Sequence, residues 1–403
     1  MNTLSERKQK RVMWLCWTVY VAAYLGRYSY QANVNLIMAD YGADHAEAGL
    51  VATFFFFAYG AGQVIHGLLC RKYPERTLIP LVLAASAALN LPLYFGAVPF
   101  PVIKYLWFVN GLLQSVLWPL VVLLLSRNLD EAHLHRAILL MSTTTSVGTL
   151  LAYGGSAAFV RWGSYRLSFL AGCIVPVLAG LAWLLLYSPI PGTAPAPGPA
   201  KKARAGGKLT AIPFFLVLLG FFAAADNFMR DGLQTWVPAI LKETYRLPDD
   251  LSIILSLVLP VLGIFGAMLT IAVNRRIKGY VPLAAFFFGL SALLIACIRC
   301  FSLGAVLLLA AMGCVVLLAH AINNVVTALA PLELRSRFNS GTIAGVLNGC
   351  CYVGSTVSTY ALGTLADRRG WNAVFSLLLL CAAAAAAAGL AYSLLHKNGR
   401  SGG

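Results

Sequence analysis

The stretch Trp14–Met38, WLCWTVYVAAYLGRYSYQANVNLIM, is an apolar run of helical length with one arginine, Arg27, near its middle. A charge at that depth in hydrocarbon is costly, so such a residue is expected to face a protein interior or a wet cavity and to mark a functional site. A second apolar run carries Arg230, 203 residues later, and each arginine has a glutamine four residues on, Gln31 and Gln234. The pair predicts one shared binding site for an anion.

Composition sets the class of protein. The chain has 403 residues, of which 60% are hydrophobic and 11% charged, with a mean hydropathy of +0.78. A soluble domain of this length is not so apolar, so we expect an all-α membrane protein. Spans of roughly 20 residues are predicted at 12–38, 47–70, 78–97, 102–127, 136–160, 166–187, 210–240, 250–273, 280–299, 303–330, 337–366 and 371–395.

These twelve transmembrane helices are expected to form two pseudo-symmetric six-helix bundles. Residues 188–209 are rich in Pro, Gly, Ala and Lys, which is typical of a solvated linker between bundles 1–187 and 210–403. FVRWGSYRLSF at 159–169 and LADRRGWNAVF at 365–375 lie 206 residues apart, close to the offset of the two arginines. Such an internal repeat around a site in the middle of the membrane is the sequence sign of a secondary transporter.

Positive charge is distributed unevenly between the predicted loops. One face of the membrane receives 20 of the 30 Lys and Arg residues, including both tails, and the other receives 8. This positive-inside bias predicts an inner-membrane protein with both termini in the cytoplasm. The net charge of +16 therefore belongs to short loops and does not indicate nucleic-acid binding.

No pattern in the chain indicates an enzyme. There is no Walker A loop, no His/Glu set with metal-ligand spacing, and no loop long enough for a catalytic domain. The nine cysteines are scattered through apolar runs, which is typical of buried structural thiols. We expect no metal and no cofactor.

Around Arg27 the polar residues fall on one helical face, at Tyr20, Tyr24, Gln31 and Asn35. A guanidinium group offers a planar fork that matches two phosphate oxygens, so Arg27 favours an organophosphate ligand. The alternative is a buried arginine paired with a carboxylate for structural reasons.

Arg230 has a carboxylate one helical turn earlier, Asp226, which is expected to share its face and to act as its counter-ion. Asp226 has a second interpretation as a proton acceptor in transport. Asp231 is adjacent in sequence and is expected to point elsewhere around the helix.

Other runs carry polar or aromatic residues at helical spacing that are candidates for the lining of a wet central path. For any one of them, an interhelical hydrogen bond is an equally good interpretation. A titrating role near neutral pH is a further alternative for the histidine. These candidates are Trp118, Asn227, Gln234, His320, Asn324, Asn348 and Tyr352.

The motifs resemble a known family. Five segments carry the resemblance: GRYSYQANVNLI at 26–37, WFVNGLLQSVLWP at 107–119, RDGLQTWVPAIL at 230–241, GTIAGVLNGCCYVGS at 341–355 and DRRGW at 367–371. The chain is similar to the major facilitator superfamily and, within it, to the organophosphate:phosphate antiporters. The resemblance implies that Arg27 and Arg230 bind the substrate phosphate, that Tyr352 lines the cavity, and that the halves rock around the site.

Three substitutions set this chain apart from that family pattern. Gln63 stands where many members have a lysine, Tyr28 follows the first arginine where a lysine is frequent, and Thr145 replaces a histidine. We therefore expect a binding site at these residues that is less positive than in sugar-phosphate carriers.

The sequence therefore predicts a secondary active transporter, acting as a monomer in the lipid bilayer. Its expected cargo is a small organic anion, such as a sugar or glycerol phosphate exchanged for inorganic phosphate. Two alternatives stay open. One is proton-coupled transport of a neutral or zwitterionic metabolite, and the other is a transporter-like sensor of phosphorylated sugars.

Overall fold

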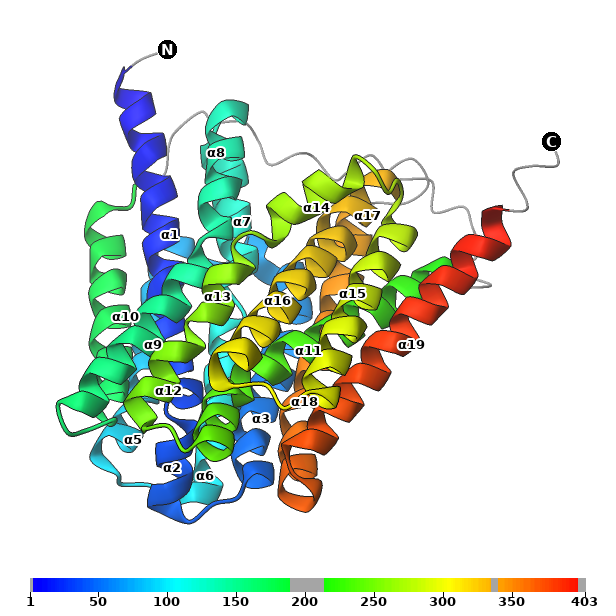
Figure 1. The fold of residues 1–403 in the computed structure, drawn as a ribbon. Coiled ribbons are helices and arrows are strands. Elements are labelled where there is room, and N and C mark those ends of the chain that lie inside the picture. The colour runs from blue at the N-terminus through cyan, green and yellow to red at the C-terminus, as the bar shows by residue number, and fades with distance from the viewer. Residues whose placement is uncertain (1–2, 189–213, 335–339, 398–403) are drawn as a thin grey trace. The chain divides into compact units, whose positions relative to one another are not determined.

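The computed structural model describes residues 3–188, 214–334 and 340–397. Within these ranges every regular element is a helix (Figure 1), as predicted. The predicted linker, apart from Ser188, lies outside the described residues. The helices run in the order α1 (Thr3–Ala32), α2 (Val34–Tyr41), α3 (His45–Leu69), α4 (Glu75–Ala88), α5 (Leu91–Phe95), α6 (Phe100–Gln114), α7 (Leu117–Asn128), α8 (Glu131–Ser142), α9 (Thr144–Arg161), α10 (Leu167–Leu186), α11 (Phe214–Tyr245), α12 (Asp249–Ser256), α13 (Val258–Gly263), α14 (Gly266–Asn274), α15 (Tyr280–Cys300), α16 (Ala305–Asn324), α17 (Ala330–Glu333), α18 (Ser340–Arg369) and α19 (Trp371–Lys397).

Each of the twelve predicted spans is helical over most of its described length, and several are broken into two or three helices. Among the described residues, eight spans are long and apolar enough to cross a membrane by composition alone. The spans that fall short are the first, fifth, seventh and eleventh, because polar and charged residues lower their hydropathy. They are related in pairs by the six-helix offset of the predicted repeat, so polarity recurs at equivalent places in the two halves.

The chain divides into two compact units. Unit 1 comprises Met1–Gly42, Phe54–Lys202 and Pro248–Leu257. In it, α1 packs against α9 and α10, and α10 packs against α4. A core that includes Leu117 and Trp183 joins α1, α4, α7 and α10, with the Trp183 and Tyr187 rings stacked at 4.4 Å.

Unit 2 comprises Ala43–Thr53, Ala203–Leu247 and Val258–Gly403. Its main helix contacts join α11 to α18 and α15 to α19. The α11 and α18 backbones touch at Gly354, where an added Cβ would lie 2.0 Å from the Ala224 carbonyl oxygen. This close approach places the middle of α11 directly against the side chains of α18. The bundle boundaries at 187 and 210 stay a prediction.

Candidate substrate-binding residues

Arg27 lies on α1 among aromatic rings of unit 1. Its guanidinium carbon is 4.4 Å from the ring centroid of Tyr24, 4.8 Å from that of Tyr28, and 5.4 Å from those of Phe55 and Tyr59. Its Nη2 donates to the Tyr28 hydroxyl at 3.2 Å. Arginine over a desolvated aromatic face is stabilised by about 2 kcal/mol. The ring faces therefore compensate for part of the hydration that the guanidinium loses when it is 9% exposed.

Hydroxyl groups fix the positions of these rings. The Tyr24 hydroxyl is 2.7 Å from the Thr145 hydroxyl, which links α1 to α9. The hydroxyls of Tyr20 and Tyr59 are 3.0 Å apart, and the Trp118 ring lies 5.2 Å from that of Tyr20. Thr145 and Trp118, which were predicted from separate helices, thus lie in one aromatic cluster with the residues around Arg27.

A small cavity of about 10 Å³, room for about one water molecule, lies beside the arginine. The residues around it come from α1, α3, α6 and α7, and they mix aromatic, polar and aliphatic groups. They are Tyr20, Ala23, Tyr24, Arg27, Tyr59, Gln114 and Leu117. The side chain of Gln31, one turn farther along α1, is also buried, and its amide oxygen accepts no hydrogen bond within the described residues. Buried acceptors in native structures are normally satisfied.

Side chains from α4, from α6 and from Asn90, which precedes α5, hold the α1 backbone next to Arg27. Asn90 and Asn110 each donate to the Gly26 carbonyl oxygen at 3.1 Å. Ser86 donates to Asn110, and Gln114 donates to Ser86, at 2.6 and 2.9 Å. All four side chains are at most 2% exposed. Ser86 and Asn90 are not among the residues predicted from the sequence, although a polar residue inside an apolar run is a usable signal.

Arg230 lies on α11 in unit 2, and its carboxylate partner is not the expected one. Its Nε donates to Asp231 Oδ1 at 3.0 Å, and the two side chains are 15% and 12% exposed. Asp226, the predicted partner, makes no ion pair with Arg230 within 4 Å. The expectation that Asp231 points away was wrong, because its Oδ1 accepts from Arg230 Nε while its other oxygen is held by Ser355.

Asp231 is itself held from α18. Ser355 donates to Asp231 Oδ2 at 2.5 Å and accepts from Asn227 at 3.2 Å. Asn323 on α16 donates to the Asn227 amide oxygen at 3.5 Å. The predicted residues Asn227 and Arg230 therefore lie in one polar network, which also includes Asp231 and Ser355.

Asp226 is fully buried, with 0% exposure. Among the described residues, neither of its carboxylate oxygens makes a hydrogen bond of good geometry, and the Asn323 side chain on α16 is a polar neighbour. An isolated carboxylate in such a place is costly when charged. The roles of Asp226 as counter-ion or proton acceptor stay predictions.

The remaining candidates have varied surroundings. Gln63, Gln234, Asn324, Asn348 and Tyr352 are half-buried. The His320 ring fills a recess against α13 and α14, where an added Cβ at Gly263 or Gly266 would lie 2.5 Å from a His320 carbon. That contact gives His320 a packing role. Among the described residues, no cluster of His, Cys, Asp and Glu side chains is arranged to hold a metal ion.

Comparison with known proteins agrees with this fold. The family model described as Major Facilitator Superfamily matches residues 16–359. A protein named "Probable hexose phosphate transport protein" from Chlamydia pneumoniae is 23% identical over 97% of this chain and 92% of its own length. The "Membrane sensor protein UhpC" of Escherichia coli K12 is 25% identical over 45% of this chain and 42% of its own.

Solved structures show the same fold at low sequence identity. A crystal structure of a bacterial homolog to the human lysosomal transporter Spinster superposes with a TM-score of 0.72, at 13% identity, over 96% of this chain and 95% of its own. The sequence-based prediction of a transporter fold rather than an enzyme is confirmed, and the names of the relatives agree with the resemblance to organophosphate carriers. The chain belongs to the Major Facilitator Superfamily of membrane transporters.

Proposed function

We propose that the chain is a secondary active transporter of a sugar phosphate or a closely related phosphate ester, exchanged for inorganic phosphate by alternating access. The names of the relatives support the substrate class, and the matched relative from Chlamydia pneumoniae spans nearly the whole chain. The observation that carries the proposal is Arg27, a guanidinium near the middle of the first predicted span, surrounded by aromatic rings and beside a small cavity.

The surroundings of Arg27 suit a phosphoryl group. Tyr24 and Tyr28 lie over the guanidinium, whose N–H groups lie in the plane of the fork and include the one that donates to the Tyr28 hydroxyl. Two parallel N–H···O bonds to one phosphate are the strong form of this interaction. Tyrosine hydroxyls beside the cavity add donors and acceptors for a phosphate or a sugar hydroxyl.

We propose that Arg230 binds the same substrate molecule during the cycle. In the structure Asp231 occupies its Nε edge. An incoming phosphate would compete with that carboxylate or add to the remaining N–H groups. The Asp231 carboxylate therefore acts as a placeholder that keeps the guanidinium paired when no substrate is bound.

Counterflow in proteoliposomes tests the proposal. Vesicles loaded with phosphate should take up labelled hexose phosphate, and Arg27→Lys and Arg27→Ala should lose at least about tenfold in uptake, since a charge-assisted bidentate contact is lost. Arg161→Ala is the matched control, because that arginine is 77% exposed and its ion pair with Asp250 is long, at 3.9 Å. Full uptake by the Arg27→Ala variant would refute the assignment.

A second candidate function is proton-coupled transport through Asp226, favoured by its complete burial and by the lack of a hydrogen bond of good geometry to its carboxylate among the described residues. Uptake would then collapse with the proton gradient and would not need internal phosphate. Asp226→Asn separates the two proposals: it abolishes proton-driven uptake but leaves phosphate exchange intact.

A sensor function is favoured by the relative named as a membrane sensor protein. It predicts that purified protein binds a hexose phosphate with no counterflow. We also propose that the transporter is inserted in an inner membrane with both termini in the cytoplasm, and that it acts as a monomer. The uneven distribution of Lys and Arg supports the orientation.

A further inference from the structure

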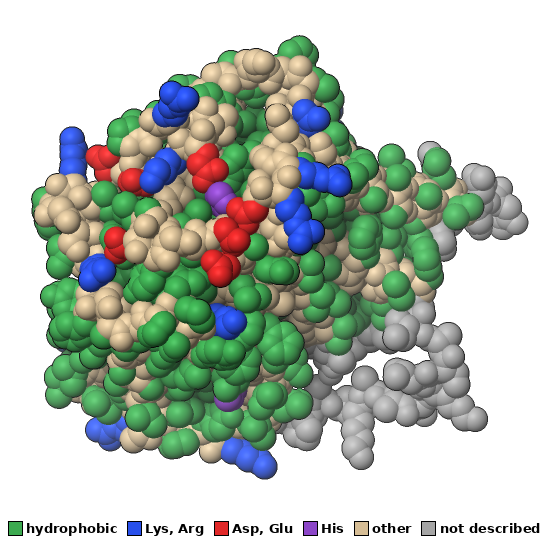
Figure 2. All heavy atoms as spheres, turned by 90° about the horizontal axis from the view of Figure 1, so that it is seen from below, with side chains coloured by type: hydrophobic (Ala, Val, Ile, Leu, Met, Phe, Trp, Pro, Cys, Tyr) green, Lys and Arg blue, Asp and Glu red, His purple; other side chains and the backbone are tan. Residues whose placement is uncertain are grey.

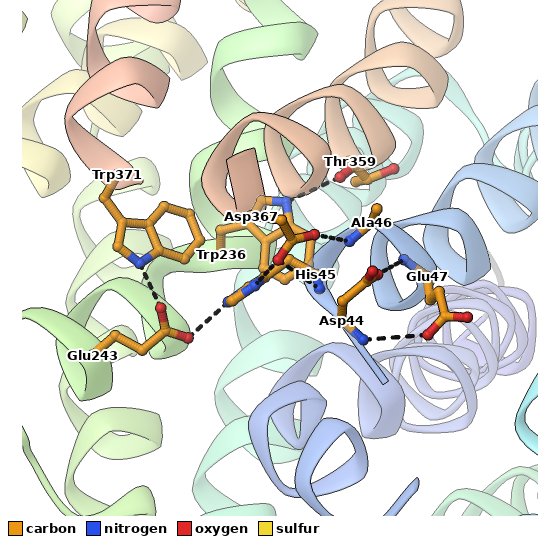
Figure 3. Close-up of polar contacts among 9 residues, drawn as sticks. All are labelled: Asp44, His45, Ala46, Glu47, Trp236, Glu243, Thr359, Asp367 and Trp371. Carbon is orange, nitrogen blue, oxygen red and sulfur yellow. Dashed lines mark hydrogen bonds and ion pairs between the residues drawn. The ribbon is translucent and has the colours of Figure 1, made fainter. Parts of the chain in front are cut away.

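A histidine bridges two carboxylates where α3 begins. His45 Nε2 is 2.7 Å from Glu243 Oε1 on α11, and His45 Nδ1 is 2.5 Å from Asp367 Oδ1 on α18 (Figure 3). The Asp367 carboxylate also accepts the backbone N–H groups of His45 and Ala46, at 3.2 and 2.8 Å. All these residues belong to unit 2. One side chain thus joins three helices.

The geometry of the cluster requires a proton. A neutral imidazole has one N–H donor and one acceptor, whereas an ionised carboxylate only accepts. Both ring nitrogens of His45 face carboxylate oxygens within hydrogen-bond distance, so both must donate, or one carboxyl group must carry the proton instead. Either way the assembled cluster holds one proton more than a neutral His45 and two free carboxylates.

Neighbouring residues complete the surroundings of the ring. From α19, Trp371 is uncharged and donates its indole N–H to Glu243 at 2.9 Å. The Trp371 and Trp236 rings lie 5.3 and 5.4 Å from the His45 ring. The charged groups bonded to the ring are therefore the Glu243 and Asp367 carboxylates. Figure 2 shows acidic side chains gathered near a histidine on the face that it displays.

The acidic residues on the His45 segment have another role. Asp44 and Glu47 form a capping box, in which each backbone N–H donates to the carboxylate of the other, at 3.3 and 2.7 Å. They are engaged with the start of α3 rather than with the imidazole. The His45 side chain is 15% exposed, and its carboxylate partners are 40% and 24% exposed, so protons have access from water through the carboxylates.

Small residues let the first turns of α3 lie directly on α18. An added Cβ at Gly49 would lie 2.3 Å from the Thr359 carbonyl oxygen, and one at Gly363 would lie 2.4 Å from the His45 carbonyl oxygen. This is a close contact of backbone on backbone, and the polar bonds of His45 lie at its beginning, in the first turn of α3.

We propose that His45, Glu243 and Asp367 form a proton-operated latch that holds the start of α3 on α11 and α18 and releases it when the proton leaves. The residues of α3 from Phe54 onward belong to unit 1, so the latch acts on a helix shared by both units. A conformation that separates His45 from its carboxylates binds the proton less tightly. By linkage, lower pH on the side of the membrane where His45 lies favours the latched conformation. The coupling to transport rests on the proposed function.

Intrinsic fluorescence tests the latch without any substrate. A protonated imidazole quenches a neighbouring indole, and two indoles flank His45. In the purified full-length protein, emission should rise as pH is raised from about 6 to about 9, and His45→Gln should abolish that rise. His66→Gln is the matched control on the same helix. Trp371→Phe should reduce the amplitude. An unchanged titration in His45→Gln would overturn the proposal.

A second measurement connects the latch to transport. One linked proton changes a conformational equilibrium by up to about tenfold per pH unit. In the wild type, the rate of hexose phosphate exchange for phosphate should therefore depend on the pH on the side of the membrane where His45 lies. This dependence should be lost in His45→Gln and weakened in Asp367→Asn. If both variants keep the wild-type pH profile, the latch is refuted. If no exchange occurs at all while the fluorescence titration behaves as expected, the proposed function fails and the latch stands.

Discussion

Arg230 donates to Asp231, its neighbour in the chain, and not to Asp226 one turn earlier. Adjacent residues on a helix normally point apart. Here the second oxygen of Asp231 accepts from Ser355 on α18, which holds the carboxylate in reach of the arginine Nε. Arg230 and Asp231 together carry no net charge, so this region attracts an anion less strongly than a lone arginine would.

Asp231→Asn tests whether this carboxylate competes with the substrate. Removing its charge frees the guanidinium, and a charge-assisted bond is typically 1.5–3 kcal/mol, so the Kd for a doubly charged phosphate ester should fall about tenfold. A sugar sulfate, which carries one charge at every working pH, should gain less. Thermal-shift titration with both ligands measures the difference.

Asp250→Asn is the control for this variant, because Asp250 lies 3.9 Å from the exposed Arg161 and should leave both Kd values unchanged. Equal or weaker binding of the phosphate ester by Asp231→Asn would contradict the placeholder role.

The sequence revealed Arg27 and its polar face because a charge inside an apolar helix is a strong local signal. It did not reveal the Asp231 pairing, since that depends on Ser355, 124 residues away in sequence. It also missed the His45 cluster. A histidine at the end of a span is unremarkable by itself, and its partners lie 198 and 322 residues away. Periodicity located the helices, and packing between distant helices decided which polar groups meet.

Tyr28 should contribute to substrate binding mainly through its ring. Tyr28→Phe removes the hydroxyl that accepts from Arg27 at 3.2 Å but keeps the ring over the guanidinium. We expect a change in KM of no more than a few-fold. Tyr28→Ala also removes the cation–π contact, of about 0.5–2 kcal/mol, and should raise KM by a further several-fold. Counterflow kinetics distinguish the two variants, and equal effects would show that the ring contributes nothing.

Asn90 should matter for stability and for the position of Arg27. Asn90→Ala removes one of the two donors to the Gly26 carbonyl and leaves Ser29, which donates to Asn90 at 3.2 Å, without that acceptor. The loss of buried hydrogen bonds predicts destabilisation of about 1–3 kcal/mol. Thermal unfolding in detergent measures it, with Thr77→Ala, an exposed residue of α4, as the control. An unchanged melting temperature would mean that Asn110 alone suffices.

Gly354 should be the most sensitive glycine of α18. An alanine there would place its Cβ 2.0 Å from the Ala224 carbonyl oxygen, which is backbone and has no rotamer to change. The helices must then separate, at a cost of about 1–3 kcal/mol or more. Their separation also lengthens the bonds that Ser355 makes to Asp231 and Asn227. Gly345→Ala is a matched control on the same helix, because no atom of the described residues lies within 4 Å of its added Cβ. That variant should be neutral or slightly more stable, since alanine is the better helix former. Gly354→Ala should therefore lower both the melting temperature and the substrate affinity. A Gly354→Ala protein as stable as Gly345→Ala would mean that α11 and α18 do not touch at this point.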